Sequence, residues 1–361
     1  MHDHPMSRTE STIDRPGVEH EELHVVRGRR SGVPIAVALH STARGPAIGG
    51  CRVKPYASLP DAVDDVLGLS RAMTFKCALA DLPHGGGKTV AAVPGPLGPP
   101  DRTSLIHDIA DLIGSLDGRY VTGPDIGTGP EDMAEIHRLT PGAAFCRPEA
   151  LGGSGDSSPA TARGVRAALD AAVGRSLHAD SVAGLRIGII GFGSVGRLVG
   201  ASLVADGADV VATDVADRRE QARCAGVTWT TSDLLGADLD VLVPAATGGL
   251  LTPGAVLTCR ARVVVGPANN QLAGDDVAEL LRQRSITWVP DVIASAGGII
   301  HAVCREELGR DEWETNARID AIGATVTRIL TEAAGQGITP LQAALALAGA
   351  CGSGPRERAI G

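Results

Sequence analysis

The sequence predicts an α/β protein of two domains, the second of which is a doubly wound parallel sheet. Two observations support this prediction. Short apolar runs that end at Gly, Pro or Asn alternate with longer stretches of helical periodicity along most of the 361 residues. A stretch rich in Gly, Ser and Pro at 147–158 interrupts this alternation, as a hinge between domains would. The length suffices for two domains of ordinary size.

Composition argues against several classes of partner. The net charge is −9 without a basic run, and aromatic residues make up 2%, so we expect neither nucleic acid nor a membrane as a partner. The seven cysteines are odd in number and widely spaced, which indicates reduced thiols, a cytoplasmic location and no bound metal. Residues 1–22 are polar and lack the apolar core of a signal peptide, so we expect a flexible N-terminal arm.

In the first domain, apolar alternation predicts strands and helical spacing predicts helices. The expected strands are 24–28, 34–40, 51–53, 89–93 and 119–122, and the expected helices are 59–76, 104–116 and one from about 131. Gly49 and Gly50 stand before the third strand. Adjacent glycines either form a bulge or let the backbone approach a ligand closely, and position alone favours the bulge.

The chain has only three lysines among its 33 basic residues, at 54, 76 and 88. Lys and Arg replace one another on solvated surfaces, but not where an amine must lose its proton or act as a compact charge. Lys76 near a helix end and Lys88 after a glycine turn therefore indicate a chemical site, against the alternative of two surface lysines beside a loop. Asp125 follows a predicted strand. It is either an Asx-turn residue, which its position favours, or an acid/base directed into a cleft.

The second domain begins with a helix at about 160–173 and contains the strongest local motif. A buried strand leads into Gly191-Phe-Gly193-Ser194-Val195-Gly196 and a helix to about 205, and the next strand ends in Asp214. These glycines let a pyrophosphate reach the helix N-terminus, and the acid accepts hydrogen bonds from the adenine ribose. Asp214 would repel a 2′-phosphate, so we expect NAD rather than NADP. The alternative is an α/β turn that binds no cofactor.

Further elements continue the alternation. Strands are expected at 185–190, 208–213, 227–230, 240–244, 262–267 and 286–290, and helices from 295, at 313–336 and at 341–350. Ligands of doubly wound sheets lie at the carboxyl ends of the strands. Ala245 and Ala246 follow one such end and are expected to lie against the cofactor. Asn269 and Asn270 follow the next, where they either contact a ligand or cap the loop.

Several of these segments, in this order, resemble motifs of the amino acid dehydrogenases that oxidatively deaminate leucine, valine, phenylalanine or glutamate. The similar segments are 45–52, 73–88, 123–128, 154–161, 267–272 and 296–298, and the similarity extends from about 33 to 342. The resemblance implies a substrate-binding and oligomerisation domain at 23–145 plus about 330–361. It also implies a Rossmann NAD-binding domain at 146–329, a cleft between the two domains, and a homo-oligomer.

The resemblance further implies roles for individual residues in the first domain. Lys76 would bind the substrate α-carboxylate, helped by backbone N–H groups near Gly49 and Gly50. Lys88 would be the base that activates water, with a pKa lowered by Lys76 and by burial. Asp125 would exchange protons with the amine or imine nitrogen.

On the cofactor side, the resemblance implies that Thr161 holds the nicotinamide amide. Asn270, with Asn269, would lie near the substrate carboxylate and the nicotinamide ribose. The expected reaction is the NAD-dependent oxidative deamination of an apolar L-amino acid to the 2-oxo acid and ammonia, and its reverse. A glutamate-type enzyme and a catalytically silent NAD-binding homologue are the alternatives.

The side-chain preference rests on four positions. Glutamate-specific relatives carry a lysine nine positions before the first motif lysine. Leu67 stands there in this chain, and a carboxylate buried against it would be costly. Gly123, Ile299 and Ala302 are expected to line the pocket. They do not separate Leu or Val from Phe, because one methylene changes selectivity by only about 1–3 kcal/mol.

Overall fold

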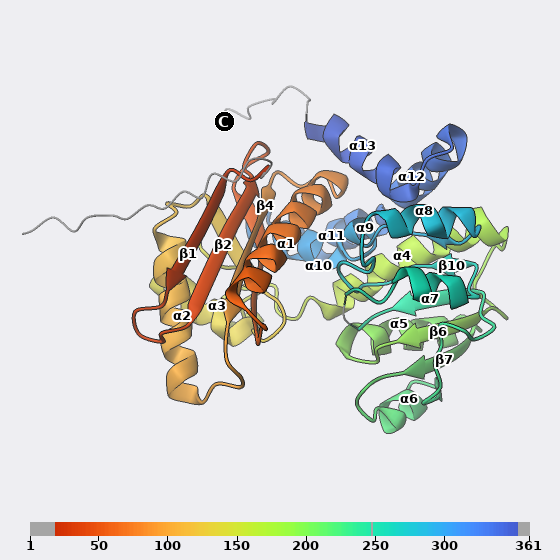
Figure 1. The fold of residues 1–361 in the computed structure, drawn as a ribbon, viewed down its shortest axis with the longest axis horizontal. Coiled ribbons are helices and arrows are strands. Elements are labelled where there is room, and N and C mark those ends of the chain that lie inside the picture. Colours follow the sequence, from red (N-terminus) through yellow and green to blue (C-terminus); the bar gives the residue numbers. More distant parts are fainter. Residues whose placement is uncertain (1–18, 247, 353–361) are drawn as a thin grey trace, which may run out of the picture. The chain divides into compact units, whose positions relative to one another are not determined.

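The computed structural model describes residues 19–246 and 248–352, which form two compact units. The first unit comprises the chain up to Thr74 together with His84–Ala144, and the second comprises Phe75–Pro83 and the chain from Phe145 onward. Each unit has a sheet of its own (Figure 1). Of the predicted N-terminal arm, residues 1–18 lie outside the described part, as do the last residues from 353.

The first unit contains a mixed five-stranded sheet in the order β1-β2-β4-β3-β5. Its strands are β1 (Glu22–Arg27), β2 (Pro34–Ser41), β3 (Ala47–Lys54), β4 (Gly85–Ala92) and β5 (Tyr120–Pro124). β1 and β4 each pair antiparallel with β2, whereas β3 pairs in parallel with both β4 and β5. The carboxyl ends of β3, β4 and β5 therefore meet at one end of the sheet.

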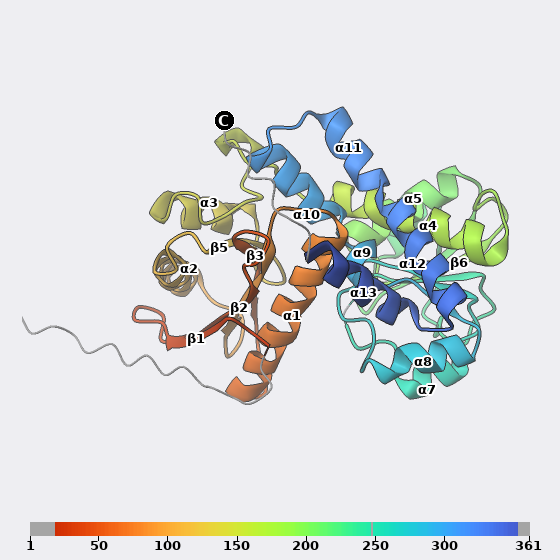
Figure 2. The same ribbon diagram turned by 90° about the horizontal axis from the view of Figure 1, so that it is seen from above.

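Helices cover both faces of this sheet (Figure 2). They are α1 (Leu59–Leu79), α2 (Pro99–Gly114) and α3 (Pro130–Leu139). In β2, Ile35, Val37 and Leu39 are buried in one core with residues of α2 and α3, while Ala36 and Ala38 are buried with residues of α1. Successive side chains of a strand point to opposite faces. The branched residues therefore fill the larger core, and the alanines let α1 lie close to the sheet.

The second unit contains a six-stranded sheet in the order β11-β10-β9-β6-β7-β8, with every neighbouring pair parallel. Its strands are β6 (Arg186–Ile190), β7 (Asp209–Thr213), β8 (Thr228–Trp229), β9 (Val241–Pro244), β10 (Val263–Val264) and β11 (Thr287–Trp288). Numbered within the unit, this is the 3-2-1-4-5-6 order of dinucleotide-binding sheets. Central strands such as β9 are buried along their whole length, as helices on both faces require.

The helices of the second unit precede, connect and follow these strands. They are α4 (Ser158–Leu177), α5 (Ser194–Ala205), α6 (Arg219–Cys224), α7 (Pro253–Thr258), α8 (Asp276–Gln283), α9 (Asp291–Ala294), α10 (Gly297–Ala302), α11 (Glu312–Asp320), α12 (Ile322–Gln336) and α13 (Pro340–Gly352). A 3₁₀ turn at Glu149–Leu151 and a π-helical segment at Val303–Glu307 complete the unit.

The structure differs from the sequence-based prediction at several boundaries. Gly49 and Gly50 lie inside β3 and pair with Thr122 and Gly123 of β5, so the bulge favoured by position is wrong. Lys88 lies in the middle of β4 rather than at its start. The single helix expected at 313–336 is two helices, and the break lies beside Gly323, where a Cβ atom would come 3.1 Å from a carbonyl oxygen of α4. The short helices α6, α7 and α8 were not predicted.

The division of the chain also differs from the one drawn from the sequence. Residues from about 330 were assigned to the first domain, but the structure groups them with the second unit. α12 packs on α4, and Leu341 of α13 packs against the core formed by β9, β10 and α8. The boundary after Ala144 lies one residue from the predicted one. The last turn of α1, which carries Lys76, belongs to the second unit as well.

Candidate active site

Three parallel strands of the first unit bring together one carboxylate and two cations. Lys88 of β4 places Nζ 2.6 Å from Oδ2 of Asp125, which immediately follows β5. Arg52 of β3 donates from Nε to the same oxygen at 3.0 Å. All three side chains are nearly excluded from solvent, with 7% of Lys88, 13% of Asp125 and 9% of Arg52 exposed. A buried carboxylate is thus fully paired within this unit.

The two cations determine the ionisation of Asp125. Burial alone would raise the pKa of this carboxyl group. The charges of Lys88 and Arg52, with the hydrogen bonds from Lys88 and the backbone of Ile126, outweigh burial and hold the pKa well below its usual range. Asp125 is therefore ionised at neutral pH and carries a negative charge inside this unit.

The turn after β5 does not depend on the Asp125 carboxylate in the way that its position suggested. The Thr128 hydroxyl accepts a hydrogen bond from the Asp125 N–H at 3.0 Å and donates to the Cys51 carbonyl oxygen at 2.7 Å. The Thr128 N–H donates to the Asp125 carbonyl oxygen. Thr128 therefore holds the turn, and the carboxylate is directed at Lys88 and Arg52.

Glycine at position 50 is required by this arrangement. A Cβ atom on Gly50 would lie 2.8 Å from Cβ of Asp125 and 2.9 Å from Nζ of Lys88. On Gly49 it would lie 1.8 Å from the Gly87 carbonyl oxygen. Gly123 pairs with Gly50 across β3 and β5. The adjacent glycines thus allow protein atoms of β4 and the segment after β5 to lie close to β3, whereas the predicted approach to a ligand stays a prediction.

Lys76 lies in a different environment, within the second unit. Its Nζ donates to Oγ of Ser295 at 2.8 Å and to Oδ1 of Asn269 at 3.2 Å. The Ser295 hydroxyl in turn donates to the Asp291 carbonyl oxygen at 2.6 Å. The lysine is 8% exposed. Of the predicted residues, Lys76 and Asn269 are therefore brought together.

Asn270 does not share that contact with Lys76. Its side chain is exposed, its backbone has a φ of 53°, and its N–H donates to Oδ2 of Asp291 at 2.7 Å. Burial raises the pKa of Asp291, a residue that the sequence did not single out. Asn270 thus fixes the loop after β10 through its backbone, which leaves its amide free to reach a ligand.

The glycine turn after β6 fits a dinucleotide. Gly191 has a φ of 102°, and a Cβ atom there would strike the backbone of Ala245 and Ala246. A Cβ on Gly196 would lie 2.2 Å from the Gly191 carbonyl oxygen, whereas one on Gly193 would meet nothing within 4 Å. The first and third glycines are needed by the fold, and the second leaves open space before the N-terminus of α5, where a pyrophosphate would bind.

Residues around this turn complete the candidate cofactor site. Ser194 and Val195 form the first turn of α5. Asp214, directly after β7, accepts hydrogen bonds from the N–H groups of Phe192 at 2.6 Å and Ala216 at 2.9 Å. Its carboxylate is thereby held beside the glycine turn, and its remaining lone pairs suit ribose hydroxyls. The residues present therefore fit NAD.

The remaining predicted residues lie in both units. The Thr161 hydroxyl, in the first turn of α4, donates to the Ser157 carbonyl oxygen at 2.9 Å. A Cβ on Gly298 of α10 would lie 2.7 Å from this hydroxyl, so the starts of α4 and α10 are in contact. On α10, Ala302 is buried and Ile299 is half-buried. Leu67, on α1 in the first unit, is also half-buried.

Sequence reasoning missed Arg52 and Ser295. Arg52 lies within the glycine segment at 45–52, but 30 of the 33 basic residues are Arg, so residue type did not distinguish it. Ser295 precedes the glycines of α10, and Ser before a helix is an ordinary cap. Only the contacts with Asp125 and Lys76 single these residues out.

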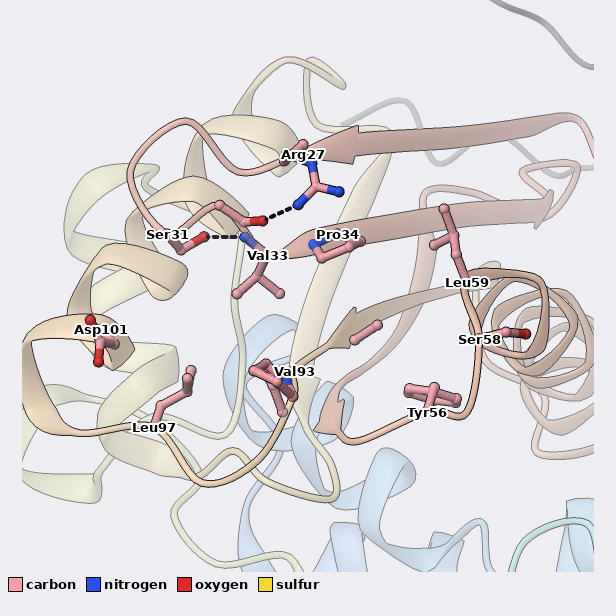
Figure 3. A pocket seen from close by; sticks show the side chains of 13 residues that line it. Arg27, Ser31, Val33, Pro34, Tyr56, Ser58, Leu59, Val93, Leu97 and Asp101 are labelled. Atoms are coloured by element: carbon pink, nitrogen blue, oxygen red, sulfur yellow. Dashed lines mark hydrogen bonds between the residues drawn. The ribbon is translucent and has the colours of Figure 1, made fainter.

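A cavity of about 440 Å³ lies elsewhere in the first unit, where β2 begins and β4 ends (Figure 3). Its lining includes Arg27, Val33, Tyr56, Leu97 and Asp101. None of the residues predicted to bind substrate or cofactor lines it. Among the described residues, no helix is long and apolar enough to cross a membrane, and no group of three or more His, Cys, Asp or Glu side chains is arranged to hold a metal.

Comparison with known proteins assigns both units. Residues 21–141 match the model of the Glu/Leu/Phe/Val dehydrogenase dimerisation domain, and 213–345 match that of Glutamate/Leucine/Phenylalanine/Valine dehydrogenase. The chain is 39% identical to valine dehydrogenase of Streptomyces virginiae, over 90% of this chain and 91% of that protein. The chain belongs to the Glu/Leu/Phe/Val dehydrogenase family. As a member of this family it is an oxidoreductase, an amino acid dehydrogenase.

Two further similar proteins support the family assignment. The chain is 35% identical to phenylalanine dehydrogenase of Caldalkalibacillus thermarum, over 90% of this chain and 89% of that one. The crystal structure of L-tryptophan dehydrogenase from Nostoc punctiforme matches with a TM-score of 0.76 and 29% identity, over 93% of this chain and 96% of that one. Residues 161–250 also match the NAD-binding domain model of D-isomer specific 2-hydroxyacid dehydrogenases. The second unit is thus an NAD-binding domain.

Proposed function

We propose that this family member oxidatively deaminates an apolar L-amino acid to the 2-oxo acid and ammonia, with NAD, and catalyses the reverse reductive amination. The observation that carries the proposal is the buried contact of 2.6 Å between Lys88 Nζ and Asp125 Oδ2. It places an amine and an ionised carboxylate together in a chain whose relatives include valine and phenylalanine dehydrogenases. Amino acid, NAD⁺ and water are consumed, and 2-oxo acid, ammonium ion, NADH and a proton are formed.

The residues of the first unit would handle the protons. Asp125 takes a proton from the substrate ammonium group, so that the nitrogen lone pair is available when the Cα–H bond breaks. When bound, NAD supplies the acceptor for the hydrogen that leaves Cα. Lys88, as the neutral amine, then removes a proton from the water that attacks the imine carbon. The short distance between the two groups lets a proton pass between them.

Residues of the second unit would bind the substrate carboxylate and NAD. Lys76 donates to oxygens of Asn269 and Ser295, and its positive charge suits a substrate carboxylate. The N–H groups near Gly49 and Gly50 of the first unit would add hydrogen bonds. Asn270 and Thr161 are assigned to the carboxylate and the nicotinamide end of the site.

The preference for an apolar side chain is supported by four residues. Leu67 offers no charge to a side-chain carboxylate, and burying an unpaired carboxylate costs several kcal/mol. Gly123 and Ala302 are small and buried, and Ile299 is apolar and half-buried. We assign these residues to the side-chain pocket and Asp214 to the choice of NAD over NADP.

The substrate panel tests this proposal. NADH consumption is measured with ammonia and each of 4-methyl-2-oxopentanoate, 3-methyl-2-oxobutanoate, phenylpyruvate, indolepyruvate and 2-oxoglutarate. We expect turnover with at least one of the first four and less than a hundredth of that rate with 2-oxoglutarate. Preference for 2-oxoglutarate would overturn the assignment of Leu67. Binding of NAD without turnover of any acid would indicate a silent homologue.

Lys88→Ala tests the mechanism. We expect kcat to fall by at least about 10²-fold, the lower end for loss of a general base. The affinity for NAD, measured by fluorescence titration, should stay within twofold, since the glycine turn lies in the other unit. Asp125 keeps Arg52 as a partner in this variant, so the fold should persist. Ordinary turnover by the variant would contradict the mechanism.

The assembly and location follow the same reasoning. The match of residues 21–141 to a dimerisation domain supports a homo-oligomer formed through the first unit. Cys51, Cys146, Cys224, Cys259 and Cys304 have free thiols, which supports a reducing, cytoplasmic location.

A further inference from the structure

Arg52 lies between two carboxylates of the first unit. Its Nε donates to Oδ2 of Asp125 at 3.0 Å, and its Nη1 donates to Oδ2 of Asp65 at 3.1 Å and to Oδ1 at 3.3 Å. The side chain is 9% exposed. A guanidinium group has several donors in a rigid plane, so one side chain can bridge two acceptors in this way.

Asp65 is itself held from the other side. The Tyr56 hydroxyl donates to its Oδ2 at 2.5 Å, and Lys54 Nζ lies 3.7 Å from the same oxygen. Lys54 also lies 4.5 Å from the centre of the Tyr56 ring. Asp65 projects from α1, whereas Arg52 and Lys54 belong to β3. The bridge therefore ties a fixed carboxylate of α1 to the carboxylate that follows β5.

We propose that Arg52, anchored by Asp65, is a positioning residue for Asp125: it holds the carboxylate against Lys88 in the geometry that proton transfer needs. The inference rests on the proposed function of Lys88 and Asp125 and adds a residue to it. Arg52 acts through Asp125 and is not itself assigned a contact with substrate.

The geometry explains why Lys88 alone is insufficient. Lys88 and Arg52 both contact Oδ2 of Asp125. A lysine chain has four rotatable bonds and a single charged point, so it restrains the carboxylate weakly. Arg52, which Asp65 holds at a second point, fixes the rotation of the carboxylate.

Electrostatics support this assignment. Arg52 is among the causes that hold the pKa of Asp125 below its usual range. The other ionisable groups that act on Asp125 or are acted on by it within the unit are Lys88, Cys51, Tyr120 and Tyr56. Asp65 faces Arg52 and Tyr56, and Asp132 acts on Cys51. Burial raises the pKa of Cys51 to about 12 and also raises that of Tyr120, so both are neutral. Removing the Arg52 charge should therefore raise the pKa of Asp125.

The first experiment compares Arg52→Lys and Arg52→Met with wild type. Arg52→Lys keeps the charge but cannot bridge two carboxylates. We expect its kcat to fall at least tenfold, with KM for the amino acid changed less than threefold. Arg52→Met loses the charge, and we expect the acidic limb of kcat/KM to move upward by about one pH unit. Arg30→Lys is the matched control, because Arg30 pairs with the buried Asp108 at 3.0 Å in the same unit.

A merely structural role would lower the melting temperature and the amount of active enzyme but leave the acidic limb in place. An unchanged limb in Arg52→Met, or a kcat of Arg52→Lys within twofold of Arg30→Lys, would overturn the proposal. If Arg52→Met does not fold, Asp65→Asn replaces it. Asp65→Asn weakens the contact that anchors Arg52. We expect it to lower kcat strongly when it is introduced into wild type, but only slightly when it is introduced into Arg52→Lys.

A second readout needs no turnover and separates this inference from the proposed function. The melting temperatures of wild type and Asp125→Asn are compared over a range of pH, and the pH at which they coincide reports the Asp125 carboxyl group. We expect this pH to be higher in the Arg52→Met background. If wild type turns over no amino acid, the proposed function fails. If the pH at which the two melting temperatures coincide is the same with and without Arg52→Met, the proposed role of Arg52 is wrong.

Discussion

At the scale of single residues, the buried ion pair of Lys88 and Asp125 affects the stability of the fold. Removing one partner from a buried ion pair usually costs about 3–5 kcal/mol, because an uncompensated charge remains. Asp125, however, pairs with two cations, Lys88 and Arg52. Loss of either one leaves the carboxylate with a partner.

The low pKa of Asp125 makes stability depend on pH. A carboxyl group whose pKa is lower in the folded state stabilises the fold above its unfolded pKa of about 3.9, and this stabilisation disappears as pH falls through the folded value. Asp125→Asn mimics the protonated form. We expect it to melt below wild type at pH 7, with a difference that shrinks steadily as pH falls below about 4. A difference that stays constant down to pH 2 would contradict the lowered pKa.

At the scale of elements, β6, the glycine turn and α5 form a continuous segment. Each of its three glycines is present for a different reason. Gly191 has a positive φ, and Gly196 lies so near the Gly191 carbonyl oxygen that a Cβ atom would clash with it. Gly193 has open space instead. The fold explains two of the glycines, and we assign the approach of the pyrophosphate to the third, Gly193.

Gly193→Val tests this distinction. The added side chain meets nothing within 4 Å of its Cβ, so we expect the melting temperature to change by less than about 2 °C. The affinity for NAD should fall at least tenfold, because the side chain occupies the approach of the pyrophosphate. Gly236→Val is the control: it also has open space and lies in the same unit, and its affinity for NAD should equal that of wild type. Equal affinity for both variants would contradict the assigned cofactor site.

At the scale of the whole molecule, the residues of the proposed mechanism belong to two units. Lys88 and Asp125, to which we assign the proton transfers, belong to the first, and the glycine turn and Lys76 belong to the second. The proposed reaction therefore draws on residues of both units. The same first unit matches a dimerisation domain, so the proposed acid–base pair and the expected assembly surface belong to one part of the chain.

Sedimentation velocity tests the expected assembly. We expect a homo-oligomer with a mass at least twice the 36.8 kDa of the chain. Addition of a reducing agent should not change it, since the five cysteines named above have free thiols. A monomer across the concentrations used for activity measurements would contradict oligomerisation through the first unit.

Much of the second unit could be predicted because its signals are local. The strand, glycine turn, helix and Asp214 follow one another within a short stretch, and their spacing reflects contacts between near neighbours. Boundaries were less predictable. Gly49 and Gly50 predicted a break in the chain, because glycine inside a strand weakens it. In the structure they stay extended, since they pair with β5 and allow neighbouring atoms to lie close to β3. The assignment of the C-terminal helix to the first domain rested on analogy with the family. In the structure, the preceding helix α12 packs on α4 of the second unit.

The sequence by itself determined the two-domain α/β class and the dinucleotide turn, because periodicity and glycine placement are visible along the chain. The resemblance of its motifs to those of amino acid dehydrogenases indicated the reaction. It also indicated Lys76, Lys88 and Asp125 as separate candidates. Only the tertiary structure decided which residues meet: Lys88 and Asp125 with Arg52, and Lys76 with Asn269 and Ser295. The physical reason is that these contacts join strands and helices far apart in sequence, and no local pattern records which of many arginines or serines a fold will bury against a given partner.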